Sequence, residues 1–274
     1  MSAGVFDRAA AEYDAARGFP PGVGEQVAQA AAGWIRPVTS DPAAPSPAAR
    51  VLEVGVGTGR IARPLAALGV RVIGVDLARQ MLAQLRASLL AGQPAPGLAQ
   101  GDVYRLPIAA GVCDAVVSVH VFQLLADWPA AAAEVRRVLR PGGVFLNGYE
   151  WRPPDSPGAR LMARWRLILA AADGPALAGA AREFGDLRAE LAQSGAAYAE
   201  RTVAHWSTTR TLARHLETIE HRTWPLSGGA AGAPLAECLA QLRTWAGIEF
   251  GALDQPHTVP HRFVWQRFVW RDRV

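Results

Sequence analysis

Short runs of β-forming residues alternate with segments of helical periodicity between residues 50 and 149. The first run, residues 50–55, ends in a glycine cluster, and a helical pattern over residues 60–68 follows it. Later apolar runs cover residues 70–75, 115–119 and 143–149, and helical patterns between them cover residues 79–90 and 130–139. Such alternation is typical of parallel strands joined by right-handed crossovers, with helices on both faces of the sheet. We therefore expect an α/β fold with a doubly wound, Rossmann-like sheet.

The flanking segments predict further elements around this sheet. Residues 6–17 and 23–35 carry apolar residues at helical spacing, and we interpret residues 37–49, rich in proline and alanine, as a connector. Residues 155–195 are mainly helical, with an apolar face formed by Leu161, Trp165, Ile168 and Leu169. We predict closing strands at residues 198–206 and 261–270, and helices at residues 209–216 and 235–250.

The composition excludes several classes of protein. With 274 residues, half of them hydrophobic, the chain can bury a full core. No run of membrane-spanning length appears, and the first residues lack the pattern of a secretory signal, so we expect a cytoplasmic protein with no membrane partner. Cys113 and Cys238 lie far apart without a CxxC pattern, which argues against a metal site or a disulfide framework.

The net charge of +4 and the pI near 9.7 raise the question of nucleic-acid binding. All 28 basic residues are arginines, and they are scattered along helical stretches rather than gathered into a tract. We interpret them as a solvated, ion-paired surface, and we do not expect a nucleic-acid partner.

The turn after the first predicted strand carries the strongest chemical signal. It reads Glu53-Val-Gly55-Val-Gly57-Thr58-Gly59, at the carboxyl end of a strand, where open α/β sheets bind ligands. A dinucleotide fingerprint would place its third glycine at the position of Arg60. A carboxylate at Glu53 would repel a pyrophosphate and favour a cationic ligand.

Two further acids follow predicted strands. Asp76 ends the second strand, about 20 residues after the glycines. A carboxylate at this separation in the sequence binds ribose hydroxyls in nucleotide-binding sheets. Asp102, after Gly101, offers an acceptor for an exocyclic amine. An adenosine beside a positive charge fits these groups, and S-adenosylmethionine is such a molecule.

In order along residues 50–150, the chain carries Glu53-x-Gly55-x-Gly57-x-Gly59, Asp76, Gly101-Asp102, Asp114 with Ser118, and Leu139-Arg140-Pro141-Gly142-Gly143. This series resembles that of the class I S-adenosylmethionine-dependent methyltransferases, of the small-molecule type with a methyltransferase-11-like domain. The resemblance implies a seven-stranded sheet with an antiparallel last strand, for which residues 261–270 are the candidate.

The resemblance also implies roles for individual residues. The turn from Gly55 to Gly59 would contact the methionine part of the cofactor, Asp76 the ribose and Asp102 the adenine amine. Tyr13 and Arg17 match a Tyr-Asp-x-x-Arg pattern on a helix that closes over the cofactor in this family. The full predicted cofactor set is Tyr13, Arg17, Glu53, Gly55, Gly57, Thr58, Gly59, Asp76, Leu77, Met81, Gly101, Asp102, Val103, Ser118 and Val119.

Structural alternatives stay open for these residues. The glycines could only form a tight turn, Asp76 could cap the helix that begins near Ala78, and Asp102 could be a loop acid. Tyr13 and Arg17 could belong to an ordinary surface helix. Trp165 and Trp206, in or near the predicted cap, could line a pocket or form core.

His120 follows the fourth predicted strand and is the candidate general base, although relatives often carry a histidine where Gln123 stands. Gln123, Tyr149 and Trp151 are candidates for contact with the acceptor. We expect a monomer or homodimer that methylates a small molecule by in-line transfer. A methyltransferase of RNA or protein, or a non-catalytic binding protein, is the alternative.

On this interpretation the chain is a single methyltransferase domain over residues 1–274. It divides into N-terminal helices (residues 1–36), a cofactor-binding core (50–150), a helical cap insertion (152–196) and a closing part (197–274).

Overall fold

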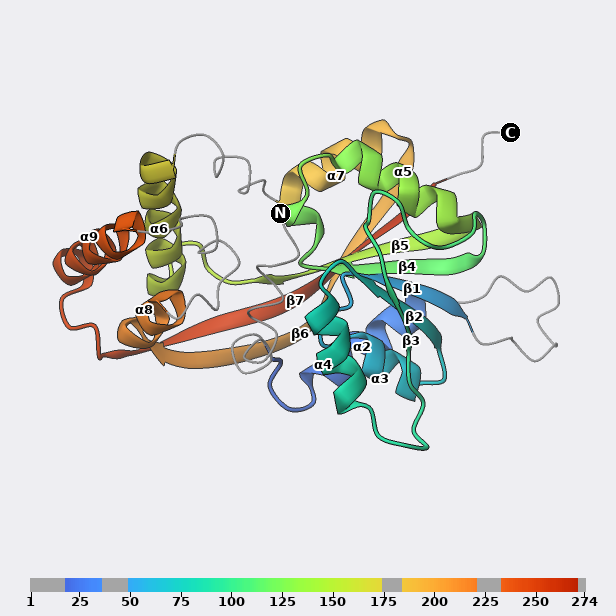
Figure 1. Cartoon of the computed structure of the whole chain (residues 1–274), viewed down its shortest axis with the longest axis horizontal. Coiled ribbons are helices and arrows are strands. Elements are labelled where there is room, and N and C mark those ends of the chain that lie inside the picture. Colours follow the sequence, from blue (N-terminus) through green and yellow to red (C-terminus); the bar gives the residue numbers. More distant parts are fainter. Residues whose placement is uncertain (1–17, 36–48, 174–183, 221–232, 271–274) are drawn as a thin grey trace.

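The computed structural model describes residues 18–35, 49–173, 184–220 and 233–270. They include a seven-stranded sheet with the strand order β3-β2-β1-β4-β5-β7-β6 (Figure 1). The strands are β1 (Arg50–Val54), β2 (Arg71–Asp76), β3 (Gly97–Gln100), β4 (Cys113–Val119), β5 (Leu139–Trp151), β6 (Ala196–Thr211) and β7 (Pro256–Trp270). β7 runs antiparallel to both of its neighbours, and the other paired strands run parallel. The predicted seven-stranded sheet with an antiparallel last strand is confirmed. The helix predicted over residues 6–17 lies outside the described residues.

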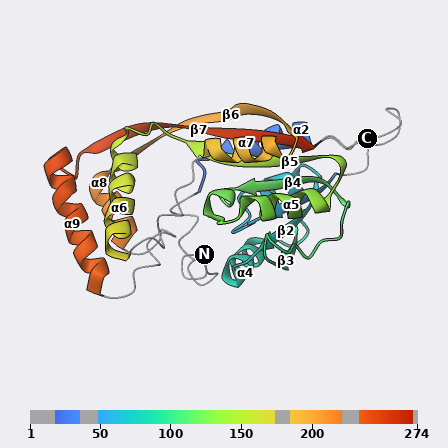
Figure 2. The same cartoon turned by 90° about the horizontal axis from the view of Figure 1, so that it is seen from above.

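Helices cover both faces of this sheet (Figure 2). α2 (Val23–Trp34), α3 (Ala62–Ala67) and α4 (Arg79–Ser88) pack on one face, and α5 (Trp128–Val138) and α7 (Phe184–Gln193) on the other. Consecutive residues of β4 join opposite cores, because strand side chains alternate between faces: Ala115 and Val117 join the first core, and Val116 joins the second. Burial on both faces explains why the central strands read as continuous apolar runs.

A separate helical cap lies beyond the sheet, at the far ends of β6 and β7 (Figure 1). It consists of α6 (Pro157–Asp173), α8 (Leu212–Glu220) and α9 (Ala233–Phe250). Their apolar faces form a core of their own, in which Leu161, Trp165 and Leu242 are fully buried. The predicted apolar face of α6 is therefore part of the core of the cap.

The cap differs from the predicted insertion over residues 152–196. α7, which lies in that range, packs against α5 and β6, and its Leu187 and Leu191 belong to the core of the sheet. α8 and α9 come from the predicted closing part instead. An apolar helix face shows that a helix is buried on one side but does not identify the surface that covers it, which is why the sequence assigned α7 to the cap.

None of the described helices combines the length and the hydrophobicity that a membrane-spanning segment requires.

Candidate functional site

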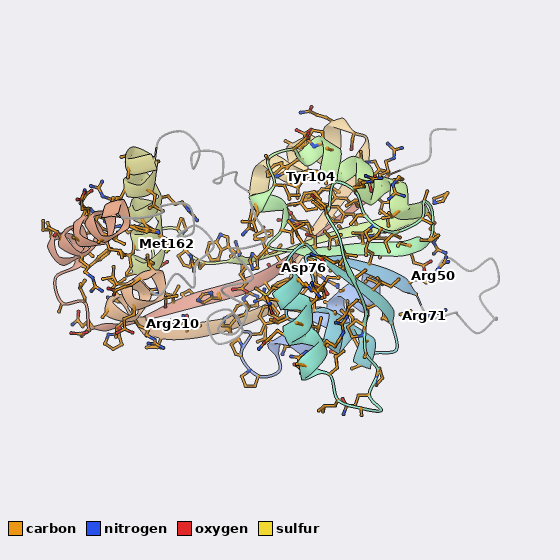
Figure 3. All side chains as sticks on the ribbon, viewed as in Figure 1. Arg50, Arg71, Asp76, Tyr104, Met162 and Arg210 are labelled. Atoms are coloured by element: carbon orange, nitrogen blue, oxygen red, sulfur yellow. The ribbon has the colours of Figure 1, made fainter. Side chains whose placement is uncertain are left out.

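The candidate site lies at the carboxyl edge of the parallel strands. In Figure 3, Arg50 and Arg71, the first residues of β1 and β2, lie at the far right, and Asp76, the last residue of β2, lies at the centre, toward the cap. A cavity of about 260 Å³, called the first cavity below, opens at this edge. Since β1 pairs in parallel with both β2 and β4, the residues that follow these strands meet there.

The glycine turn after β1 forms part of the wall. Gly57 has a φ of 53°, in the left-handed region, and a Cβ built on it would meet no atom within 4 Å, because it would point into open space. Gly55 also lines the first cavity. Gly59 does not: a Cβ there would lie 2.4 Å from Cδ1 of Leu85, so this glycine allows α4 to pack against the turn.

Asp76 joins two segments of the wall. Its Oδ2 accepts a hydrogen bond from the Gly57 N–H at 2.8 Å, and its Oδ1 accepts one from the Ala78 N–H at 2.8 Å. The N-cap residue of α4 is Ala78, so Asp76 is not the helix cap that was the structural alternative. A carboxylate offers about four acceptor positions, so both oxygens can still accept bonds from a ligand.

Glu53 lies buried beneath the turn and does not line the cavity. Its side chain accepts a hydrogen bond from the Ala62 backbone, while its Oε2 has no hydrogen-bond partner within the described ranges. Burial raises the pKa of Glu53 well above its usual value, although the Arg60 charge opposes this effect. A cationic ligand above the turn would favour the charged carboxylate.

Most of the other predicted cofactor residues line the first cavity. They are Leu77, Met81, Gly101, Asp102, Val103 and Val119. Sequence reasoning missed the remaining wall, which consists of Val54, Val75, Tyr104, Val121, Leu124, Leu125 and Ala126. The Tyr104 hydroxyl accepts a hydrogen bond from the Asp127 N–H at 3.2 Å and so joins two of these wall segments. Leucines after a strand resemble core residues, and no sequence signal separates the two cases.

Several predicted residues lie elsewhere. Thr58 and Ser118 are buried and line neither the first cavity nor the second one described below. The acceptor candidates Gln123, Tyr149 and Trp151 are half-buried, and they also line neither cavity. Trp151 instead packs under the Arg262 guanidinium, whose central carbon lies 3.9 Å from the ring centroid. Tyr13 and Arg17 lie outside the described residues.

His120 lines the first cavity and has an uncommon backbone conformation. Its φ is 59°, and non-glycine residues in this region are held there by their surroundings and are concentrated at functional sites. Its Nε2 lies 3.5 Å from Oε1 of Glu150, which also accepts a hydrogen bond from Arg60 at 2.8 Å. The sequence singled out His120 but not Glu150.

Glu150 also lines a second cavity of about 120 Å³, at the junction between the sheet and the cap. The contact between His120 and Glu150 therefore connects the two cavities. Trp206 lines this second cavity and stacks on His261 with ring centroids 5.4 Å apart, whereas Trp165 is buried in the cap. Of the two tryptophans that the sequence left open, one belongs to a pocket and the other to a core.

Comparisons with known proteins agree with this architecture. Residues 52–147 match the sequence family described as a methyltransferase domain. A malonyl-[acyl-carrier protein] O-methyltransferase of Serratia marcescens is 35% identical over 144 residues, which cover 53% of this chain and 50% of that protein. A demethylmenaquinone methyltransferase of Deinococcus radiodurans is 38% identical over 126 residues, which cover 45% and 52%. The chain thus spans about half the length of these curated relatives.

Among solved structures, the YcgJ protein of Bacillus subtilis superimposes with a TM-score of 0.55 at 20% identity, over 82% of this chain and 93% of that one. This likeness concerns the fold alone. By the sequence match over residues 52–147 and by the order of its strands, the chain resembles the class I S-adenosylmethionine-dependent methyltransferases.

Proposed function

We propose that this chain binds S-adenosylmethionine in the first cavity and transfers its methyl group in line to a small-molecule acceptor. The observation that carries the proposal is that Asp76 and Asp102 line one cavity, while Glu53 is buried beneath the glycine turn in its wall. One curated relative is named for malonyl-[acyl-carrier protein] and the other for demethylmenaquinone, and the second name supports a small-molecule acceptor.

The residues present fit this cofactor. Asp76 keeps acceptor capacity for ribose hydroxyls, and the exposed Asp102 can accept a bond from the adenine amine. Leu77, Met81 and Leu124 provide apolar surface for a flat base. The Glu53 oxygen that lacks a partner among the described residues suits a nearby positive charge.

The cofactor supplies an electrophilic methyl group on a sulfonium, and the chain orients the acceptor. Orientation alone can supply about 7–11 kcal/mol of a barrier. In our proposal His120 takes a proton from an acceptor that arrives protonated, and Glu150, 3.5 Å away, holds the imidazole in position. An acceptor that is already ionised needs no base.

Turnover tests the proposal directly. Incubation with S-adenosylmethionine labelled in its methyl group and a bacterial metabolite extract should give a labelled small molecule that depends on the chain. The His120→Gln variant should bind the cofactor as the wild type does, and with a protonated acceptor it should turn over about 10²–10⁴-fold more slowly. Tight cofactor binding without any labelled product would contradict transfer and favour a non-catalytic binding protein.

Gly57→Ala should weaken S-adenosylmethionine binding by about tenfold or more, because the added methyl group would occupy open space at the wall of the first cavity. The backbone strain of alanine at positive φ should lower the free energy of unfolding by about 1–2 kcal/mol. Calorimetric titration and urea denaturation measure the two effects.

Gly111→Ala is the matched control. Gly111 has a φ of 68° and open space around its Cβ position, but it does not line the first cavity. This variant should lose similar stability and keep the wild-type affinity for the cofactor. Equal affinities in the two variants would show that the cofactor does not approach Gly57.

A further inference from the structure

The second cavity is assembled from the end of β5, the start of α6, α8 and the far ends of β6 and β7. In Figure 3, Arg210 and Met162, which line it, lie on the cap side, away from Asp76. Glu150 lines its other side and contacts His120 of the first cavity. A ligand in the second cavity can therefore extend toward the place where the methyl group is transferred.

One face of the paired strands β6 and β7 brings basic side chains to this cavity. Trp206 pairs with His261, Thr208 with Val259, and Arg210 with His257. Because strand side chains alternate, every second residue of each strand faces the cap, and these pairs form one surface. These residues are half-buried, apart from the exposed Arg210, and the residues between them are exposed.

Further basic groups come from other elements. Arg152, which follows β5, and His215 of α8 line the same cavity. His257 lies in an adjoining cavity that shares Gly158, Thr208, Arg210, His215 and Val259 with it. Gly158 is required by this arrangement, because a Cβ there would lie 2.9 Å from Nε2 of His215.

The start of α6 adds hydrogen-bond donors. Ser156 is 8% exposed, it lines the cavity, and its hydroxyl has no hydrogen-bond partner within the described part of the chain. Gly158 and Ala159, in the first turn of this 17-residue helix, also line the cavity. Backbone N–H groups in a first turn have no partner within the helix, and the helix dipole favours an anion there.

Glu150 is the one acidic residue among the described residues that line the second cavity, and its Oε1 is held by Arg60 and His120 at its inner side. Two arginines, two histidines, a buried hydroxyl and a helix N-terminus face it. Arginine and backbone N–H groups are the groups that bind carboxylates and phosphates.

We propose that the second cavity binds a carboxylate or phosphate group of an anionic acceptor, with Arg152, Arg210, Ser156 and the start of α6 as the binding groups. The inference rests on the proposed function, because it takes this anion to be part of the molecule that is methylated. The acceptor then carries its charge on the cap side and its reactive atom near His120.

The electrostatics of His215 agree with this assignment. The pKa of His215 is lowered to about 4, chiefly by burial and also by the charges of Arg152, Arg210, His257 and His261. The ring is therefore neutral near pH 7. A bound anion would partly offset the positive potential that the ring experiences, so its proton affinity and its NMR signal should respond to binding.

Binding can be measured without turnover. We would titrate the full chain with malonate in one series and inorganic phosphate in another, at constant ionic strength and pH 6.5. The readout is the Cε1–H signal of His215, assigned in the wild-type protein by triple-resonance spectra. One or both anions should give saturable shifts of His215, and the more effective anion identifies the group that the acceptor carries.

Arg210→Met should weaken this binding by at least about tenfold. Arg214→Met is the matched control, because Arg214 lies on the exposed surface of α8, paired with Glu217, and should change the affinity by less than about twofold. Absence of saturable shifts with both anions, or an equal loss in the two variants, would overturn the inference. Each variant is also titrated with S-adenosylmethionine: cofactor binding without anion binding refutes this inference alone, and anion binding without cofactor binding refutes the proposed function.

Discussion

Asp76→Ala should weaken S-adenosylmethionine binding by at least about tenfold, which corresponds to about 1.4 kcal/mol, in calorimetric titrations. Two losses combine in this variant. In the proposed complex the ribose loses a charged acceptor, and such hydrogen bonds contribute about 1.5–3 kcal/mol. The Gly57 N–H also loses the carboxylate oxygen that holds it at 2.8 Å, so the glycine turn is no longer fixed in the conformation that forms the wall. NAD should not compete with the cofactor in the wild type.

Asp114→Ala is the control that distinguishes these two effects on binding from a general loss of stability. Asp114 accepts a hydrogen bond from the Arg50 N–H at 2.6 Å and pairs with Arg140 at 2.8 Å, so it also joins separate segments through its carboxylate. It lies near the start of β4, at the opposite edge of the sheet. This variant should lose stability and keep its cofactor affinity within about twofold. If Asp76→Ala bound the cofactor as tightly as Asp114→Ala, the proposed contact with the ribose would be wrong.

The sheet could be predicted from the sequence because each central strand is buried on both faces. β1 reads as an apolar run with a glycine turn directly after it, and the last four of its five residues are buried. The positions of Gly55, Gly57 and Asp76 at one edge then follow from parallel pairing, without knowledge of any contact.

The second cavity could not be predicted in this way. Arg152, Arg210 and His215 come from three parts of the chain, and only the register of β6 against β7 and the packing of the cap bring them together. The ends of β6 and β7 extend past their predicted bounds with residues such as Thr208 and Thr209, which carry no apolar alternation. Polar strand residues that face a half-buried pocket look like loop residues in a sequence.

The cap was recognisable as helical, but its packing was not. The apolar stripe of α6 correctly identified the buried side chains of that helix, and α8 and α9 were each predicted as helices. That these three helices share one core follows from contacts between segments far apart in the chain. Whether α6, α8 and α9 share one core is therefore tested by the loss of stability when a side chain of that core is removed.

Trp165→Ala should lower the free energy of unfolding by about 3–5 kcal/mol, the usual effect of removing a large aromatic side chain from a core. Trp165 is fully buried in the cap, next to the core residues Leu161 and Leu169. Met162, from the same turn of α6, lines the second cavity, so the packing of that wall should weaken. The first cavity should keep its affinity for the cofactor. Urea denaturation followed by circular dichroism measures the stability, and a calorimetric titration measures the cofactor affinity.

Phenylalanine substitutions at two buried tryptophans provide the control. The Trp165 indole N–H has no hydrogen-bond partner among the described residues, whereas the Trp265 indole N–H donates to the Val27 carbonyl at 3.0 Å. Both side chains are fully buried. Trp165→Phe removes a buried donor without a partner, so it should be less destabilising than Trp265→Phe by about 1 kcal/mol or more. Equal losses would mean that the Trp165 N–H is satisfied in solution, and a loss below about 1.5 kcal/mol in Trp165→Ala would mean that the cap does not fold around this residue.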